Sequence, residues 1–234
     1  MKKKIGISVS EINFEPYKIW FSGLGPEDDI ELVELSFKEG HPEAIAGCDG
    51  LVLTGGIDIC PVEYGIPERS YPHAPKTFSP ERDYYEIELF RLAQENHLPV
   101  LGICRGMQLI NTICNGTLVL DLGDGHLNQI HKGSPDKSHH LTIIPGTLLE
   151  EIADEHAGVV NSAHHQAICE IGEGLMINCQ AADGIIEGIE WTDKNGKPFM
   201  LAVQWHPERM PDKEENPLSK NIRDRFIAEV IKNG

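Results

Sequence analysis

Hydrophobic residues of the chain gather in short continuous runs, separated by loops and by segments with helical spacing. Such runs are typical of buried strands, and they occur at residues 5–9, 50–54, 99–103 and 200–204, with a further strand predicted at residues 31–35. A helix is predicted to begin at Ser79-Pro80, where apolar residues then recur among charged ones. Because strands that alternate with helices build parallel sheets, we expect an α/β fold. It should have one doubly wound, mostly parallel sheet with helices on both faces.

The second half of the chain is richer in strand patterns. Residues 141–144 form another apolar run, and Lys194–Lys197 is a turn sequence. That turn predicts a hairpin between residues 188–192 and 199–205. The predicted sheet therefore gains an antiparallel extension.

Capping residues predict two further helices. Thr147 and Glu150 have the spacing of a capping box that opens a short helix. Asn216-Pro217 predicts a terminal helix that runs to about Lys232. Residues 57–80 are rich in proline and glycine and read as one long loop, and loops of that length are usually functional. With no internal repeat or linker, residues 1–234 are expected to form one domain.

Charge and cysteine content narrow the class of protein. The chain has 234 residues, 40% of them hydrophobic, and a formal net charge of −17. This charge argues against nucleic acid and anionic membranes as partners. The six cysteines form no C-x-x-C pair, which favours a reducing compartment. No apolar run is long enough for a signal peptide or a membrane span, so we expect a cytoplasmic protein.

The strongest candidate for chemistry is Cys104. It ends the apolar run 99–103, has glycines at positions 102 and 106, and precedes a helical pattern that stops at Asn115-Gly116. A cysteine on a tight turn from strand to helix has the geometry of a nucleophile elbow. The glycines keep Cβ atoms away from the turn, and the helix N-terminus favours the thiolate. The alternative is one more buried core cysteine, which is our expectation for the other five.

A cysteine nucleophile needs a base and a group that orients the base. His206 directly follows the predicted strand 200–204, and Glu208 lies two residues further on, within reach of the second ring nitrogen. An oxyanion hole needs two backbone N–H groups near the attacked carbonyl. Arg105, directly after the cysteine, and Gly56, at the end of another strand, are predicted to supply them.

Histidines elsewhere in the chain raise the alternative of a metal site. His126, His131, His139 and His140 lie close together in sequence, but their spacing matches no compact ligand signature. We therefore expect no metal and no cofactor.

The pattern Gly-x-Cys-x-Gly-x-Gln at residues 102–108, together with His-Pro-Glu at residues 206–208, resembles the class I glutamine amidotransferase superfamily. More narrowly, it resembles the γ-glutamyl-γ-aminobutyrate hydrolase family (peptidase C26). The resemblance runs through residues 5–230, and its further motifs lie at residues 53–58, 81–86, 116–121, 161–167 and 183–187. It implies a flavodoxin-like fold.

The resemblance also implies a role for each matching residue. Cys104, His206 and Glu208 match the catalytic triad, and Gly56 and Arg105 match the oxyanion donors. The residues that match substrate-binding positions are Gly55, Gln108, Ser162, His164, His165 and Gln166.

The implied function is hydrolysis of a small γ-glutamyl amide through a cysteine thioester, which releases glutamate and an amine. One alternative is a glutaminase subunit that delivers ammonia to a separate synthetase, and another is a binding module without catalysis. The expected partner is a small γ-glutamyl substrate, and a homodimer is compatible with this interpretation. The loop at residues 66–79 has an individual sequence and is expected to shape the leaving-group side of the site, so the identity of the amine stays open.

Overall fold

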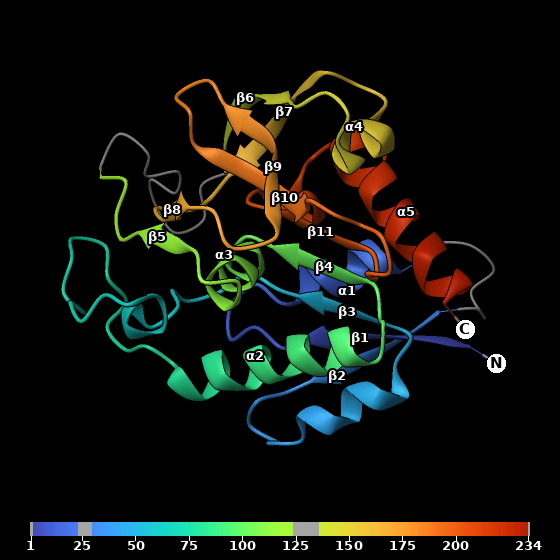
Figure 1. Ribbon diagram of the computed structural model, residues 1–234, viewed down its shortest axis with the longest axis horizontal. Helices are drawn as coiled ribbons and strands as arrows, with labels where there is room; N and C mark the ends of the chain where they lie inside the picture. The colour runs from blue at the N-terminus through green and yellow to red at the C-terminus, as the bar shows by residue number, and fades with distance from the viewer. Residues whose placement is uncertain (1, 23–29, 124–135, 234) are drawn as a thin grey trace.

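A nine-stranded mixed sheet runs through the protein in the computed structural model, which describes residues 2–22, 30–123 and 136–233 (Figure 1). The strand order is β2-β1-β3-β4-β11-β10-β9-β6-β7. The first five strands in this order are parallel to one another, and they are β2 (Ile30–Leu35), β1 (Lys3–Ser8), β3 (Gly50–Leu53), β4 (Val100–Ile103) and β11 (Met200–Val203). The order is that of flavodoxin-like sheets, so the predicted fold class is confirmed.

The remaining strands extend the sheet in antiparallel fashion, as the sequence predicted. They are β10 (Ile186–Trp191), β9 (Leu175–Ala181), β6 (Lys137–Ile143) and β7 (Ala157–Ser162). A separate antiparallel pair, β5 (Thr117–Val119) with β8 (Ala167–Glu170), lies beside the start of this extension.

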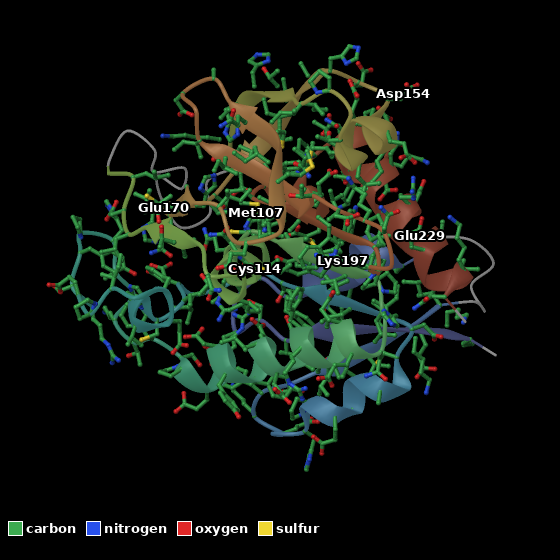
Figure 2. The ribbon with its side chains drawn as sticks, viewed as in Figure 1. Met107, Cys114, Asp154, Glu170, Lys197 and Glu229 are labelled. Carbon is green, nitrogen blue, oxygen red and sulfur yellow. The ribbon has the colours of Figure 1, made fainter. Side chains whose placement is uncertain are left out.

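Helices cover both faces of the parallel half because successive strand residues point to opposite sides. One apolar cluster joins alternate strand residues to α1 (Glu15–Phe21), α4 (Leu148–Ala153) and α5 (Pro217–Lys232). A second cluster packs α2 (Pro80–Glu95), α3 (Arg105–Ile113) and the short η1 (Pro42–Gly47) against the other face. Met107 of α3 is fully buried and lies in the middle of Figure 2, whereas the charged Asp154 and Glu229 lie toward its right-hand side.

Three of the predicted helix starts are confirmed. Helix α2 begins at Pro80, the Thr147 side chain caps α4, and the Asn216 side chain caps α5 by accepting from the Leu218 N–H. Residues 57–80 are not entirely loop, because the 3₁₀ helix η2 (Pro61–Tyr64) lies within them. Another 3₁₀ helix, η3 (Pro207–Arg209), follows β11.

Helix α1 gave no signal in the sequence because its N-cap is Phe14, which makes no side-chain cap hydrogen bond. Of the four histidines considered for a metal, His126 and His131 lie outside the described residues, and His140 is exposed on β6. Every helix in the described part of the chain is too short or too polar to span a lipid bilayer.

Candidate active site

Cys104 lies on the sharp turn between β4 and α3. Its backbone has φ 53° and ψ −104°, a conformation that costs energy for a residue with a side chain. A Cβ atom on Gly106 would lie 2.2 Å from the Leu53 carbonyl oxygen of β3. Glycine therefore allows α3 to approach the sheet closely enough to form the turn, as the sequence predicted. The cysteine is 6% exposed at the N-terminus of α3.

His206 and Glu208 lie beside this turn, at the carboxyl end of β11. The His206 Nδ1 atom is 2.8 Å from Oε1 of Glu208, whose side chain is fully buried. Asn161 of β7 fixes the main chain at this point, because it accepts from the His206 N–H and donates to the His206 carbonyl, both at 2.9 Å. With Nδ1 engaged by Glu208, Nε2 is the atom left to exchange a proton with the thiol.

The electrostatics of this group favour a thiolate. Burial alone would raise the pKa of Cys104, but the charge of His206 and a hydrogen bond with it lower the pKa below its ordinary value. Burial lowers the pKa of His206, yet Glu208 and the Cys104 thiolate outweigh burial and raise the value to about 9. Both shifts move the protonation equilibrium toward a thiolate beside an imidazolium.

Tyr17 of α1 also belongs to the site, although no pattern along the chain indicated it. Its hydroxyl accepts a hydrogen bond from the Gly55 N–H at 2.9 Å and lies 3.4 Å from His206 Nδ1. A Cβ atom on Gly55 would lie 2.7 Å from the ring of His206. The predicted substrate-binding residue Gly55 is thus packed directly between Tyr17 and His206.

Gly56 has φ 148°, in a region that side chains rarely adopt, and a Cβ atom there would lie 2.0 Å from Nη1 of Arg82. Arg82 donates from Nη2 to the Gly55 carbonyl at 2.8 Å. Because the N–H and C=O groups of a trans peptide point in opposite directions, this bond turns the Gly56 N–H away from Arg82. Arg82 is therefore a positioning residue for the predicted oxyanion donor.

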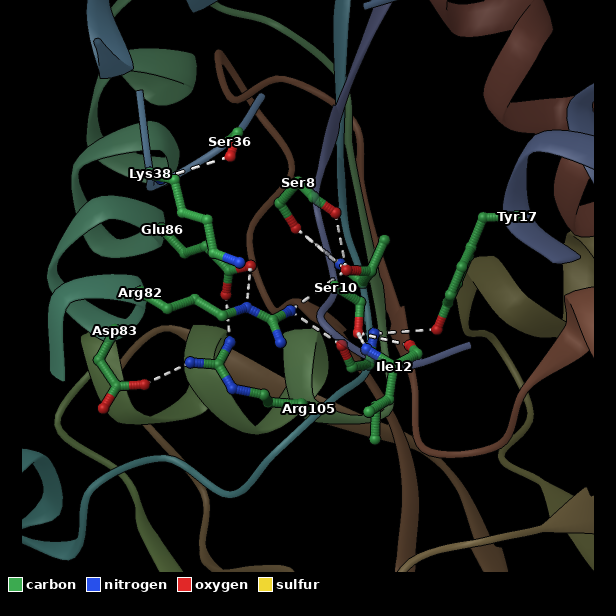
Figure 3. A network of polar contacts seen from close by, with 12 residues as sticks. Ser8, Ser10, Ile12, Tyr17, Ser36, Lys38, Arg82, Asp83, Glu86 and Arg105 are labelled. Carbon is green, nitrogen blue, oxygen red and sulfur yellow. Dashed lines mark hydrogen bonds and ion pairs between the residues drawn. The ribbon is translucent and has the colours of Figure 1, made fainter. Parts of the chain in front are cut away.

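A buried ionic network holds Arg82 in place (Figure 3). Arg82 Nε donates to Glu86 at 3.0 Å, and the Arg105 side chain is paired with both Glu86 and Asp83. All four side chains are at most 2% exposed. Because this network occupies the Arg105 guanidinium, only the backbone N–H of Arg105 is left for the predicted oxyanion hole. The motif at residues 81–86 was noted in the sequence, but its role was not.

Gln108 of α3 reaches the nucleophile through another glutamine. Its Nε2 donates to the Gln204 side chain at 3.1 Å, and Gln204 Nε2 lies 3.5 Å from the Cys104 sulfur. Gln204 is fully buried. The sequence indicated Gln108 but missed Gln204, which the parallel pairing of β4 with β11 brings next to the cysteine.

The predicted substrate segment, residues 162–166, joins β7 to β8. Ser162 Oγ and Gln166 Oε1 are buried and have no hydrogen-bond partner within the described residues. His164 lies 3.5 Å from the buried Glu187, and His165 lies 3.1 Å from Asp58. Burial lowers the pKa of each imidazole, but these carboxylates, with a smaller contribution from Cys104, raise it above its ordinary value. The segment thus lies within the electrostatic reach of Cys104.

The structure therefore brings together residues that the sequence indicated in three separate segments, 55–56, 104–108 and 206–208. Cys104, His206 and Glu208 form one connected group, Gly55 and Gly56 lie against it, and Gln108 borders it. Such a group, with a favoured thiolate, an oriented imidazole and fixed backbone donors, is suited to acyl transfer.

Comparisons with known proteins identify the family and the fold of the chain. Residues 33–208 match the model of the peptidase C26 family. A Mycobacterium tuberculosis protein that is provisionally named a glutamine amidotransferase is 40% identical over 183 residues, which are 73% of this chain but only 55% of that protein. The γ-glutamyl-γ-aminobutyrate hydrolase of Escherichia coli O157:H7 is 30% identical over 190 residues, 77% of this chain and 71% of the hydrolase.

Among solved structures, the glutaminase domain of Trypanosoma brucei CTP synthase superposes with a TM-score of 0.67 at 14% identity. The match covers 99% of this chain and 94% of that domain, and it concerns the fold alone.

Proposed function

Because the chain belongs to the peptidase C26 family, we propose that it hydrolyses the γ-glutamyl amide bond of a small γ-glutamyl compound. The products are glutamate and an amine. The observation that carries this proposal is the strained turn of Cys104, whose sulfur lies against an imidazole oriented by a buried carboxylate. Relatives named as hydrolases and as glutamine amidotransferases support an enzyme of this general type.

The first half-reaction forms a thioester. The Cys104 thiolate attacks the side-chain carbonyl of the γ-glutamyl group, and the oxyanion accepts hydrogen bonds from the N–H groups of Gly56 and Arg105. His206 then gives its Nε2 proton to the leaving nitrogen as the C–N bond breaks. Glu208 keeps the Nδ1 proton in place and stabilises the imidazolium throughout.

The second half-reaction releases glutamate. His206, now neutral, takes a proton from water, and the resulting hydroxide attacks the thioester carbonyl. The same two N–H groups hold the oxyanion, and the C–S bond breaks to restore the thiolate. Ser162 and Gln166, whose buried oxygens lack partners within the described residues, are the candidates to bind the α-amino and α-carboxyl end of the glutamyl group.

The test is glutamate release from a panel of γ-glutamyl amines, γ-glutamyl peptides and glutamine. We expect turnover of at least one γ-glutamyl amine by the protein alone, and its loss in Cys104→Ala. Cys169→Ala is the matched control, because Cys169 is an exposed free cysteine on β8. Unchanged turnover in Cys104→Ala would rule out the thioester mechanism.

The second candidate is a glutaminase subunit that passes ammonia to a separate synthetase. The names of two relatives, at 40% and 36% identity, favour it, since they refer to glutamine amidotransferases. In that case the protein alone would be nearly inactive on the whole panel, and only glutamine turnover would rise when a synthetase partner is added.

A further inference from the structure

A second cluster of potential ligand side chains shares His165 with the predicted substrate segment, and no step of the proposed reaction uses it. His73 comes from the loop before α2, Asp121 follows β5, and His165 lies between β7 and β8. Each residue offers an atom able to ligate a metal, and these three atoms lie within 4.8 Å of one another. All three residues are partly buried.

The carboxylate of the cluster is held in place by the main chain. Asp121 accepts from the N–H of Gly123 at 2.8 Å through Oδ1 and from the N–H of His73 at 3.0 Å through Oδ2. The His73 ring nitrogen Nδ1 lies 2.8 Å from the same Oδ2 atom. A residue fixed by two backbone donors keeps its position whether or not the imidazole is present, so the carboxylate is preorganised.

His165 is oriented by a second carboxylate. Its Nε2 lies 3.1 Å from Asp58 Oδ1, and Asp58 accepts from the Tyr71 hydroxyl at 2.8 Å through its other oxygen. The opposite ring atom, Nδ1, is buried and has no hydrogen-bond partner within the described residues. A histidine that gives one ring N–H to a carboxylate and keeps the other nitrogen for a cation is the usual arrangement around protein-bound metals.

We propose that His73, Asp121 and His165 form a binding site for a divalent cation of the Zn²⁺ class. Two imidazoles and a carboxylate are the donors that such ions prefer, and three protein ligands leave one position open. Ligands at about 2.1 Å from a tetrahedral ion lie about 3.4 Å apart, so small side-chain rotations from the observed cluster complete the site.

The open position gives the site a role in substrate selection. The loop at residues 66–79, which carries His73, is the one expected to border the leaving group, and His165 belongs to the predicted substrate segment. A bound cation there would attract a leaving group that carries a carboxylate, such as an amino acid. This role rests on the proposed function, whereas the metal site itself does not.

Co²⁺ is the probe for the site, because its visible absorption reports protein nitrogen and oxygen ligands. We expect the untagged, metal-stripped protein to bind one Co²⁺ with saturable absorption that Zn²⁺ displaces. His165→Gln and Asp121→Asn should abolish that absorption, and Asp58→Asn should weaken binding by about 10- to 100-fold. The matched control is His140→Gln, which removes an exposed imidazole on β6 and should bind as the unaltered protein does. Circular dichroism of each variant establishes that it is folded.

Absence of saturable Co²⁺ absorption would overturn the proposal, as would equal binding by His165→Gln and Asp121→Asn. Equal loss in His140→Gln would also overturn it. Metal removal should raise KM for γ-glutamyl amines with a carboxylated leaving group and leave KM for glutamine unchanged. Since Co²⁺ absorption needs no turnover, failure of the proposed hydrolysis leaves the metal measurement intact, and the two failures are distinguishable.

Discussion

At the scale of single residues, the site depends on a charge pair that burial alone would not permit. An isolated buried thiol has its pKa raised, as Cys179 does in this protein. Cys104 differs because His206 lies against it and is itself held in the charged form by Glu208. The carboxylate thus acts on the sulfur through the imidazole, although it does not touch the sulfur.

This coupling predicts the pH dependence of alkylation. The rate of Cys104 modification by iodoacetamide, followed by mass spectrometry of its peptide, should rise with pH and reach its midpoint below 9.0, the ordinary value for a thiol. In His206→Gln the midpoint should move above 9.0, because burial remains while the main compensating charge is gone. His156→Gln, which removes an exposed imidazole, is the control and should leave the midpoint unchanged. A midpoint that His206→Gln does not move would contradict the coupling.

Sequence patterns revealed the residues whose role is tied to local chain geometry. Cys104 lies between two glycines at a strand end, and Glu208 lies two residues after His206, so both relations can be seen along the chain. Tyr17 and Gln204 were missed because each meets its partner across a long separation. Tyr17 is 189 residues from His206, and Gln204 is 100 residues from Cys104. Contacts of that kind arise from the packing of α1 and from the β4–β11 pairing, and one sequence alone does not show them.

At the scale of elements, the elbow requires α3 to lie unusually close to β3. Burial along the chain explains which elements could be predicted from the sequence. The central parallel strands β3, β4 and β11 are continuous buried runs and were visible in the sequence. In contrast, β5 and β8 are short, include partly exposed residues and pair only with each other. Helix α1 has seven residues and no capping side chain, so its position depends on burial of Tyr17, Trp20 and Phe21 in the core.

The close approach of α3 predicts a specific loss of stability. In Gly106→Ala the new Cβ would lie 2.2 Å from a backbone oxygen that cannot rotate away, so α3 must shift. We expect the free energy of unfolding in urea to fall by about 1–3 kcal/mol or more. Gly47→Ala is the matched control, since nothing lies within 4 Å of the added atom, and its change should stay within about 0.5 kcal/mol. Equal stability of the two variants would show that the helix does not depend on this contact.

At the scale of the whole molecule, one buried ionic network links stability to the site. Asp83 and Glu86 come from α2, Arg105 from α3, and Arg82 reaches the turn after β3. Two guanidinium groups face two carboxylates, so the network carries no excess charge while it fixes the Gly55–Gly56 peptide. The helices on this face therefore do more than cover the sheet, since they determine where the predicted oxyanion donor points.

Removal of the Glu86 carboxylate should show how far the stability of the protein depends on this network. Burial raises the pKa of Glu86, but Arg105 and Arg82 outweigh it and hold the value below the ordinary 4.5. A depressed carboxyl pKa contributes stability that is present above pH 4.5 and is lost as pH falls below it. At pH 7, Glu86→Gln leaves two buried cations with one carboxylate, and we expect a loss of about 3–5 kcal/mol in the free energy of unfolding.

The measurement is urea unfolding of the unaltered protein and of Glu86→Gln from pH 7 downwards. The difference between their free energies of unfolding should narrow below pH 4.5 as Glu86 itself becomes protonated. Burial raises the pKa of Asp83, so its titration changes stability with pH in the direction opposite to that of Glu86. Because Asp83 is present in both proteins, its contribution largely cancels in the difference. Glu88→Gln is the control, because it removes a solvent-accessible ion pair with Arg91 on the same helix. It should change the free energy of unfolding little both at pH 7 and below pH 4.5. A difference in the free energy of unfolding that stayed constant with pH would mean that Glu86 acts through packing. A difference that narrows, together with a kcat of Glu86→Gln below that of the unaltered protein at pH 7, would tie the network to the position of the Gly56 N–H.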